Sequence, residues 1–428
     1  MSVSLRVAIL DEELPFPADS GKRLRTMNLL TRLAGRHEIT FITYRSADEA
    51  AMQQAGEFWR NNNVNVEWLD DCLPSKSGPL FYARLAANLF SPLPYSVQTH
   101  NRPSLRRYVR SHTGISCYDL WHCEWTPYAE SCLGVVREPW LVMAHNVESL
   151  IWRRMYETAP PSLKRWYIGH QWRKYDRFEK RAYSQAPLLV TVSDEDARLA
   201  ERDYGATNVQ VVDNGVDPVF FHPNPAFADD PHAERVPHRL LFLGSLDWRP
   251  NIDAAELLLD TVFPLIRQQV PEAELQIVGR RPSQALRDRI AATPGVTLHS
   301  DVPDVRPFLW QCGMMIVPLR IGGGSRLKIL EALATACPVV STAVGAEGLR
   351  LRPDREILIA DTPEALAESA VLAIRHPETP RRLADAGRAV VCREYGWDAL
   401  AEKLETVWIQ AATVNEQRQT DRYREVAH

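Results

Sequence analysis

The stretch from Met314 to Thr342 constrains the fold of this chain more than any other part of it. It reads MMIVPLRIGGGSRLKILEALATACPVVST. The opening apolar run is short enough for a buried parallel strand, and at the three glycines 322–324 the backbone must bend sharply or approach another group. Leucines at helical spacing follow Ser325, a typical N-cap residue, and PVVST predicts a second buried strand. This order indicates an open parallel sheet, in which ligands bind outside the carboxyl ends of the strands.

Two charged residues of the expected helix, Lys328 and Glu331, are three positions apart and therefore share one face. As a solvated ion pair they would contribute little to stability. Because they follow the glycine turn closely, we favour a functional interpretation. Lys328 would lie near a bound phosphate, and Glu331 would lie deeper, where its carboxylate can bind a diol.

Strands alternate with helices along the rest of the chain. The first half has apolar runs typical of strands at 5–10, 38–44, 64–69, 118–124, 139–145, 188–193 and 209–215, with a long helical region at 149–184. The segment 222–239 is rich in Pro, Asp and His, has no period and predicts a linker. The alternation then restarts, with predicted strands at 239–246, 274–279, 296–301, 314–319, 338–342 and 357–360.

This alternation predicts an α/β protein with two Rossmann-like, doubly wound parallel sheets. We expect an N-terminal domain at 1–222 and a C-terminal domain at 223–396. A last helix, at about 397–412, follows Tyr395 and Gly396 and is expected to pack back on the first domain.

Composition narrows the class of protein. With 428 residues, 45% hydrophobic and 24% charged, the chain has the make-up of a soluble globular protein with more than one core. A net charge of −4 argues against a nucleic-acid partner. Seven scattered cysteines without metal-ligand spacing predict no metal site and favour a reducing cytoplasm. The N-terminus is typical of a first strand, and no run approaches the roughly 18 apolar residues that span a bilayer.

Several motifs occur in an order that resembles one family. The second half contains GSLDWRPN, ELQIVGRRP, DVPDVRPFL, VPLRIGGGSRLKILEALATACPVVST and GAEGL, and the first half contains PFPADSGKRLRTMNLL, MAHNVES, VSDEDA and DNGVD. Over roughly residues 5–410 the chain resembles the GT-B-fold glycosyltransferases of family 4. It is most similar to the bacterial exopolysaccharide-associated branch that has GGG-[ST]-RLK before the helix glutamate. The resemblance implies two Rossmann-like domains that face a cleft, the first on the acceptor side and the second on the donor side.

The resemblance also implies a chemistry. A sugar would move from a nucleoside-diphospho-sugar to an acceptor hydroxyl with retention, in exopolysaccharide or glycoconjugate biosynthesis. The acceptor would be a saccharide or a lipid-linked saccharide, at a cytoplasmic site that could adjoin the inner face of the membrane. No cofactor and no metal are implied, because Arg and Lys side chains stabilise the departing diphosphate.

In the family pattern two glutamates, eight positions apart, bind the donor. The second falls on Glu331, whose carboxylate can accept from both ribose hydroxyls. The first falls on Gly323, which departs from the pattern and leaves the donor sugar open. Backbone amides of Gly323, Gly324 and Ser325 would meet the sugar or phosphate oxygens instead.

The cations for the diphosphate are expected in two places. The loop GSLDWRPN would contribute Gly244 and Ser245, and Ser245 stands where the family often has an arginine. Arg249 is the nearby cation, although it could equally be a surface residue at the start of a helix. Arg326 and Lys328 would supply the remaining positive charge.

In the first half, His145 ends the strand 139–145, where the family carries a functional histidine. A strand-end histidine is often a packed, hydrogen-bonded residue, but the family match favours binding or polarising the sugar. Gly21, after Ser20, opens the first long helix, so its amide could face the donor phosphate or the acceptor, or belong to a plain turn. Whether Glu124, at the end of the strand 118–124, lines the cleft is left open.

Two features invite other interpretations. Asp194-Glu195-Asp196 is a literal DxD metal motif, but Ser193 and Asp196 fit a helix capping box better. The helix at 162–183 is basic and aromatic, as a membrane-surface helix would be. We favour instead an amphipathic helix that packs Trp166, Ile168 and Trp172 into the first domain.

Two rival functions remain. A nucleotide-sugar 2-epimerase would need carboxylate and histidine acid–base groups around the sugar, and the turn GGG-S-RLK does not resemble that family. A nucleotide-sugar-binding GT-B subunit without activity is the other, since the first glutamate of the pattern is missing. A nicotinamide-dependent dehydrogenase is disfavoured because no GxGxxG follows the first strand.

Overall fold

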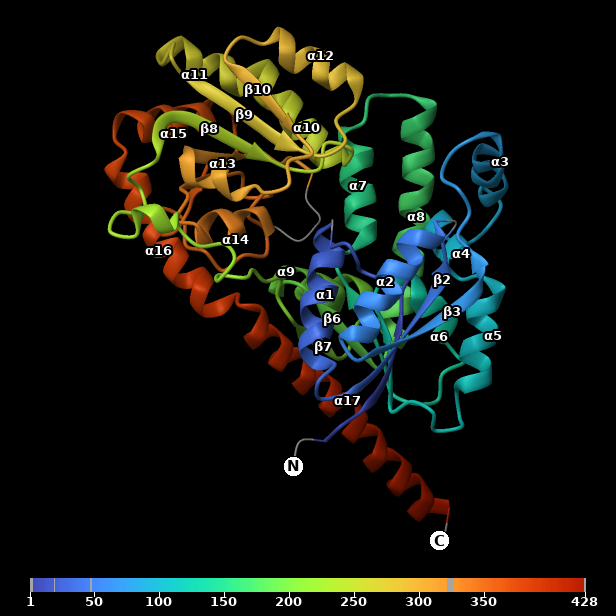
Figure 1. Ribbon diagram of the computed structural model, residues 1–428. Coiled ribbons are helices and arrows are strands. Elements are labelled where there is room, and N and C mark those ends of the chain that lie inside the picture. The colour runs from blue at the N-terminus through green and yellow to red at the C-terminus, as the bar shows by residue number, and fades with distance from the viewer. Residues whose placement is uncertain (1–2, 19, 47, 322–326, 427–428) are drawn as a thin grey trace. The chain divides into compact units, whose positions relative to one another are not determined.

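The strand pairings of this computed structural model are all parallel and form two separate sheets (Figure 1). The structure describes residues 3–18, 20–46, 48–321 and 327–426, with side chains to Thr413. One sheet has seven strands in the order β3-β2-β1-β4-β5-β6-β7, and the other has six in the order β10-β9-β8-β11-β12-β13. Helices follow most strands, as crossover connections between parallel strands require.

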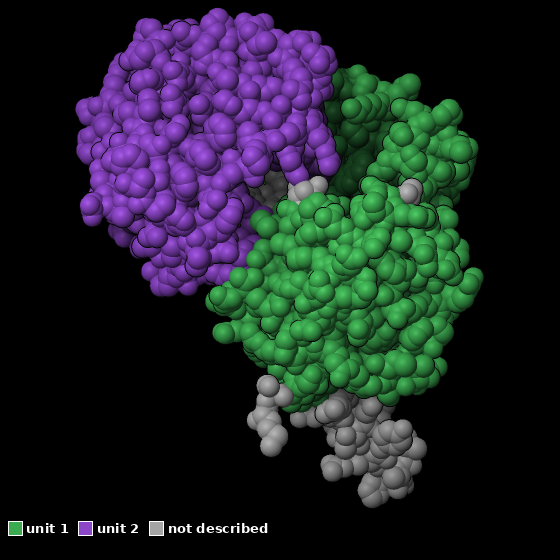
Figure 2. Space-filling view, in the orientation of Figure 1, with its two compact units in different colours: residues 1–213, 323–325, 398–428 green, residues 214–322, 326–397 purple. Residues whose placement is uncertain are grey.

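The two sheets belong to two compact units, shown in separate colours in Figure 2. Unit 1 holds the residues up to Asp213 and those from Asp398 onward. Unit 2 holds the described residues between them. The predicted fold class is therefore confirmed: each half of the chain builds its own Rossmann-like parallel sheet.

Unit 1 contains the seven-stranded sheet. Its strands are β1 (Arg6–Leu10), β2 (Glu38–Arg45), β3 (Val64–Cys72), β4 (Leu120–Cys123), β5 (Trp140–Ala144), β6 (Leu188–Thr191) and β7 (Val209–Val211). Its α-helices are α1 (Gly21–Leu33), α2 (Glu49–Asn61), α3 (Pro79–Asn88), α4 (Tyr95–His100), α5 (Pro103–His112), α6 (Ala129–Cys132), α7 (Glu148–Thr158), α8 (Leu163–Gln185), α9 (Asp194–Tyr204) and α17 (Trp397–Val426), with a 3-10 turn η1 (Thr126–Tyr128). The central strands β4, β5 and β6 are buried along their whole length, as expected where helices cover both faces of a parallel sheet.

Unit 2 repeats this plan. Its strands are β8 (Val236–Leu243), β9 (Glu274–Gly279), β10 (Val296–Ser300), β11 (Cys312–Val317), β12 (Val339–Ser341) and β13 (Leu358–Ile359). Its helices are η2 (Pro225–Phe227), α10 (Arg249–Leu257), η3 (Leu258–Val262), α11 (Phe263–Gln269), α12 (Gln284–Ala292), α13 (Arg306–Gln311), α14 (Leu327–Ala334), α15 (Pro363–Arg375) and α16 (Glu378–Glu394).

The predicted strands are confirmed, but two helical predictions need correction and one helical region was not predicted. The single helical region at 149–184 is two helices, α7 and α8, because Pro160 and Pro161 interrupt the backbone hydrogen bonds between them. Residues 79–112 form three helices, where no element was predicted. The last helix, α17, extends to Val426 instead of ending near residue 412.

Helix α17 contacts unit 1 along its first turns. Asp398 accepts from Arg32 Nε at 2.6 Å, and Glu405 Oε1 lies 3.1 Å from His37 Nε2. Lys403 Nζ lies 3.2 Å from Asp213 Oδ2. The helix therefore belongs to the unit that the first half of the chain builds.

A buried arginine ties several elements of unit 2 together. Arg235, just before β8, is 6% exposed. Its guanidinium donates to the carbonyl oxygens of Leu309 at 2.6 Å, Cys312 at 3.0 Å and Thr335 at 2.9 Å. These carbonyls belong to the C-terminal part of α13, the start of β11 and the residue directly after α14, so a single side chain satisfies acceptors from three parts of unit 2.

Replacing Arg235 by alanine should destabilise unit 2, because three buried carbonyls would lose charge-assisted hydrogen bonds. We expect the free energy of unfolding to fall by at least about 3 kcal/mol. Arg355→Ala, at an exposed position of the same unit, should change it by less than about 0.5 kcal/mol. Urea unfolding measures both, and equal midpoints for the two variants would contradict the assignment.

Candidate functional site

Four polar side chains of unit 1 follow the ends of three strands. Asp11 and Glu12 come directly after β1, Glu124 after β4 and His145 after β5. The sheet order reverses between β1 and β4, and open α/β sheets bind ligands at this point, outside the carboxyl ends of the strands. Asp11, Glu124 and His145 are each less than a tenth exposed, so their charges require partners inside the protein.

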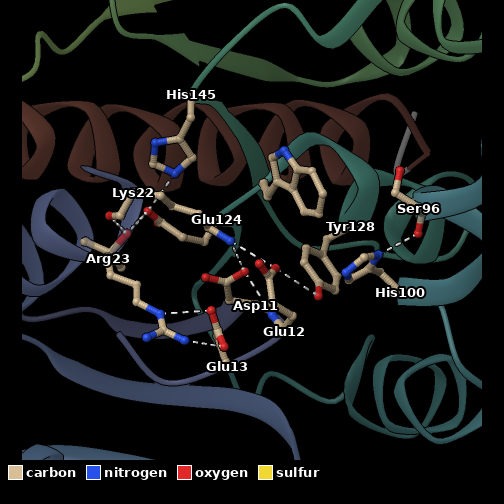
Figure 3. A network of polar contacts seen from close by, with 12 residues as sticks. Asp11, Glu12, Glu13, Lys22, Arg23, Ser96, His100, Glu124, Tyr128 and His145 are labelled. Atoms are coloured by element: carbon tan, nitrogen blue, oxygen red, sulfur yellow. Dashed lines mark hydrogen bonds and ion pairs between the residues drawn. The ribbon is translucent and has the colours of Figure 1, made fainter. Parts of the chain in front are cut away.

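Lys22, in the first turn of α1, joins the two carboxylates after β1 (Figure 3). Its Nζ lies 2.5 Å from Asp11 Oδ1 and 2.9 Å from Glu12 Oε2. Nζ also lies 5.2 Å from the centre of the Trp125 ring, and Tyr128 OH donates to Glu12 Oε2 at 3.4 Å. Burial raises the pKa of Asp11 well above its ordinary range. Burial acts the same way on Glu12, but Lys22 outweighs it and lowers the pKa of that carboxyl.

Glu124 has partners on both carboxylate oxygens. Its Oε1 accepts from Thr26 Oγ1 at 2.6 Å and lies 3.1 Å from His145 Nε2 (Figure 3). Its Oε2 lies 3.0 Å from His122 Nε2, whose N–H is not aligned for a hydrogen bond, while His122 Nδ1 accepts from Trp408 Nε1 at 3.2 Å. Burial opposes ionisation of Glu124, but His122 and His145 outweigh it and lower its pKa well below the usual range.

The structure places the predicted residues of unit 1 as follows. His145 lies directly after β5, at the carboxyl end of the sheet, and burial lowers the pKa of its imidazole. Glu124, left open by the sequence, contacts it. Gly21 is the first residue of α1, whose N-cap Ser20 accepts from Arg23 N at 3.3 Å. The functional roles of His145 and Gly21 stay predictions.

Sequence reasoning missed Asp11, Glu12, Lys22 and Thr26. One signal was available: two acids stand directly after the first strand, and the helix that follows has a lysine at its second position and a threonine one turn later. In a parallel sheet, such residues meet at the carboxyl edge.

In unit 2 the loop after β8 meets the start of α14. Asn251 Oδ1 accepts from Lys328 Nζ at 2.9 Å, and Asn251 Nδ2 donates to Ser245 O at 3.0 Å. Lys328 Nζ also lies 5.1 Å from the centre of the Phe242 ring. The order of this sheet reverses between β8 and β11, so Lys328 is held near the position equivalent to the polar edge of unit 1.

Two glycines let this loop lie close to its neighbours. A Cβ on Gly244 would come within 2.7 Å of Asn251 Cγ, and one on Gly279 within 2.0 Å of Gly244 O. Gly244 N donates to Val278 O at 3.1 Å. Close packing therefore requires glycine at Gly244, whether or not its amide side also faces a ligand.

Glu331 lies three residues after Lys328 on α14 and is half-buried. Within the described part of the chain, its carboxylate accepts no hydrogen bond and forms no ion pair. Burial raises the pKa of Glu331 to about 7, although Lys328 opposes this shift. The Glu331 carboxylate is therefore an acceptor that the described protein groups leave unused.

Two arginines of unit 2 lie near the loop after β8, and only one of them, Arg249, was named as a candidate by the sequence. Arg249 is the exposed first residue of α10, and no described residue pairs with its guanidinium. Arg280, which the sequence did not single out, donates from Nη2 to Ser245 Oγ at 3.3 Å. The predicted donor residues Gly323, Gly324, Ser325 and Arg326 lie outside the described residues.

The motif Asp194-Glu195-Asp196 forms the first turn of α9. Ser193 Oγ accepts from Asp196 N at 3.1 Å, so the predicted helix cap is confirmed. No group of three or more His, Cys, Asp or Glu in the described ranges could hold a metal ion.

The packing expected for α8 is partly wrong. Ile168 is buried and Trp172 stacks on Tyr156, but Trp166 is 57% exposed and Leu163 is 89% exposed. The first turn of this helix therefore presents apolar side chains to solvent. Among the described helices, none is both long and apolar enough to cross a bilayer.

Two family models match this chain. Residues 21–220 match the model described as Glycosyltransferase Family 4, and residues 237–376 match the one described as Glycosyl transferases group 1. Together they cover most of the chain, and each falls on one of the two parallel sheets. The chain belongs to the GT-B glycosyltransferases.

Two relatives are similar to this chain in sequence. The MMP alpha-(1->4)-mannosyltransferase of Mycolicibacterium hassiacum is 27% identical over 262 residues, a match that spans 59% of each chain. An uncharacterized 44.6 kDa protein in the cps region of Klebsiella pneumoniae is 23% identical over 388 residues, 86% of this chain and 90% of the relative.

Solved structures share the fold. Sucrose-phosphate synthase from Thermosynechococcus elongatus has a TM-score of 0.69 at 19% identity and covers 96% of this chain and 100% of its own. HepE of Anabaena, in complex with UDP and glucose, has a TM-score of 0.63 at 12% identity, with 95% and 100% covered. At these identities the likeness shows the architecture alone.

The raised pKa of Glu331 predicts a pH-dependent stability. A folded-state pKa of about 7, above the ordinary 4.5, means that the ionised group destabilises the fold, so the wild type loses stability as pH rises through this window. Glu331→Gln should gain roughly 1–3 kcal/mol over the wild type at pH 8 and almost nothing at pH 4. Urea unfolding at both pH values measures the difference. The exposed Glu368→Gln is the control, and a Glu331→Gln gain equal at both pH values would refute the assignment.

Proposed function

We propose that this protein is a retaining glycosyltransferase that moves a sugar from a nucleoside-diphospho-sugar to the hydroxyl of a saccharide or lipid-linked saccharide. The observation that carries the proposal is the unused Glu331 carboxylate, close in sequence to a lysine that Asn251 holds in place. A ribose diol supplies the two donors that such a carboxylate lacks, and a diphosphate supplies the negative charge that Lys328 attracts.

The relatives also support transfer of a sugar from a nucleotide-sugar. One is a mannosyltransferase, one lies in a cps region, and HepE was crystallised with UDP and glucose. We infer a role in exopolysaccharide or glycoconjugate biosynthesis from the second of these and from the GGG-S-RLK sequence.

In the proposed mechanism the nucleoside diphosphate leaves from the face that the acceptor hydroxyl attacks. An oxygen of the leaving phosphate takes the hydroxyl proton, so the anomeric configuration is retained. Lys328, with Arg280 and Arg249 as candidate partners, offsets the charge that develops on the diphosphate. His145 binds a hydroxyl of the sugar, and neither a metal ion nor a cofactor takes part in this scheme.

Binding is tested first with a panel of UDP-, GDP-, ADP- and dTDP-linked hexoses, each with and without EDTA. A ligand that binds the folded state raises the melting temperature, so one nucleotide should give a clear shift that EDTA leaves unchanged. Slow hydrolysis of that nucleotide-sugar without acceptor would then count against a binding subunit without activity. No shift with any member of the panel would overturn the proposed donor site.

The role of Glu331 predicts how the affinity for that nucleotide-sugar changes. Glu331→Ala should raise its dissociation constant by roughly 30–100-fold, the loss of charge-assisted hydrogen bonds worth about 2–3 kcal/mol. Because the carboxylate must be ionised to accept from both hydroxyls, wild-type affinity should rise up to about tenfold between pH 6 and 8. The diphosphodiester of a nucleotide-sugar does not titrate in this range. Calorimetry measures both effects, Glu368→Ala is the control, and equal affinities would reject the ribose assignment.

We also propose that unit 1 contacts an anionic membrane surface through Phe90, Leu163 and Trp166. These side chains are 93%, 89% and 57% exposed. They are near one another, because His170 stacks on Trp166 and its Nε2 lies 3.3 Å from Leu89 O. In the first turn of α8, Lys164 and Arg165 stand between Leu163 and Trp166, and their positive charge complements anionic headgroups.

Sedimentation with lipid vesicles tests this contact. The wild type should bind vesicles of phosphatidylcholine and phosphatidylglycerol more than pure phosphatidylcholine, because both charge and apolar area contribute. The double variant F90E/W166E should lose roughly tenfold or more in partitioning. Leu372→Glu replaces an apolar residue of unit 2 that is also 57% exposed and should not weaken binding. Equal sedimentation of F90E/W166E and wild type would reject the surface.

A further inference from the structure

The atoms around Glu124 fix the positions of several protons, beginning at α17. Trp408 is fully buried, and its indole N–H can only donate. Since it donates to His122 Nδ1 at 3.2 Å, that nitrogen is unprotonated, and the proton of a neutral His122 ring is on Nε2. His122 Nε2 lies 3.0 Å from Glu124 Oε2, so the positive edge of the ring faces the carboxylate.

Glu124 can only accept in this arrangement. Its Oε1 accepts a hydrogen bond from the Thr26 hydroxyl at 2.6 Å, and its Oε2 faces His122 Nε2. Its lowered pKa keeps it ionised. A carboxylate has no proton to give, so the 3.1 Å contact between Oε1 and His145 Nε2 requires the histidine proton on Nε2.

The other ring nitrogen of His145 is then an acceptor. Burial lowers the pKa of His145, and the positive charges of Arg25 and Lys22 act in the same direction, whereas Glu124 acts against them. The net effect favours the neutral ring, with a lone pair on Nδ1. No described residue makes a hydrogen bond to Nδ1, and His145 lies at the carboxyl end of β5, the edge where ligands of such sheets bind.

We propose that Glu124 is a positioning residue that holds His145 in its Nε2–H tautomer, with His122 and Trp408 behind it, so that His145 Nδ1 accepts a hydrogen bond from a hydroxyl of the bound saccharide. An acceptor at this point selects a hydroxyl donor over a carboxylate or the diphosphodiester of a nucleotide-sugar, neither of which has a proton to give near neutral pH. The inference rests on the proposed function for the saccharide, but the tautomer does not depend on it.

The tautomer is measured on the whole protein, without ligand, by ¹⁵N NMR of histidine-labelled protein, with His145→Gln to assign the resonance. At pH 7.5 the wild type should show a single neutral His145, with a pyrrole-type Nε2 and a pyridine-type Nδ1. Glu124→Gln should bring in the second tautomer, because an amide can donate as well as accept. A wild-type His145 that is protonated, or that carries its proton on Nδ1, would overturn the proposal whatever the protein catalyses.

A second variant, in α17, tests the contact between Trp408 and His122 with little change in side-chain shape. Trp408→Phe removes the N–H that fixes His122, and a second tautomer of His122 should appear. Trp59→Phe is the matched control, because Trp59 is also fully buried in unit 1 and its Nε1 has no hydrogen-bond partner in the described structure. Unchanged His122 resonances in a folded Trp408→Phe protein would reject the claim that Trp408 fixes the tautomer of His122.

Hydrolysis of the nucleotide-sugar with the largest thermal shift supplies a kinetic readout. Glu124→Gln should lower kcat by roughly tenfold or more, since a histidine in the wrong tautomer can lose up to about 10⁴ in kcat, while KM stays within about threefold. Trp408→Phe should lower kcat by about three- to tenfold, and Trp59→Phe should not lower it. Wild-type kcat in Glu124→Gln would contradict the positioning role. A wild type without any turnover would instead contradict the proposed function and leave the NMR result to decide the tautomer.

Discussion

The polar edge of unit 1 depends on one constraint, the burial of the charged Glu124 carboxylate. An ionised carboxylate taken out of water is strongly unfavourable unless donors surround it. Glu124 is 2% exposed, and α1, β4 and β5 each bring one such group to it, Thr26, His122 and His145. The position of His145 and the packing of α17 behind His122 therefore follow from a single charge that the fold must stabilise.

In unit 2 the carboxylate of Glu331 has the opposite environment, because no described donor contacts it. Glu331 has no hydrogen-bond partner among the described groups, and its pKa of about 7 records the unfavourable energy of its partial burial. The neighbouring groups are nevertheless ordered, since Asn251 holds Lys328 and the loop at Gly244 leaves no room for a larger residue. Among the described residues, an acceptor without a partner beside a positioned lysine is what a preorganised binding site requires.

The sequence predicted what depends on local pattern and missed what depends on distant contacts. Apolar runs alternating with helical spacing were enough for both sheets. The strand–helix boundary singled out Lys328 and Glu331 as candidates, and the family resemblance added His145 at the end of its strand. Lys22 was missed because its partners follow another element. The sequence could not pair Trp408 with His122, since 286 positions separate them and neither residue stands in a local pattern that indicates the other. Trp166 was misplaced because helical period does not show which apolar residues a neighbouring helix covers.

The contrast between the two carboxylates separates a positioning role from a binding role. Glu124 follows the buried strand β4 and Glu331 lies within α14, and the sequence favoured a binding role for Glu331 while it left the role of Glu124 open. A carboxylate whose oxygens already have protein donors can gain little from a ligand, so Glu124 acts through His145. A carboxylate that lacks protein donors gains two charge-assisted hydrogen bonds from a diol, and these offset part of the cost of its burial, so Glu331 is the group that a diol would bind.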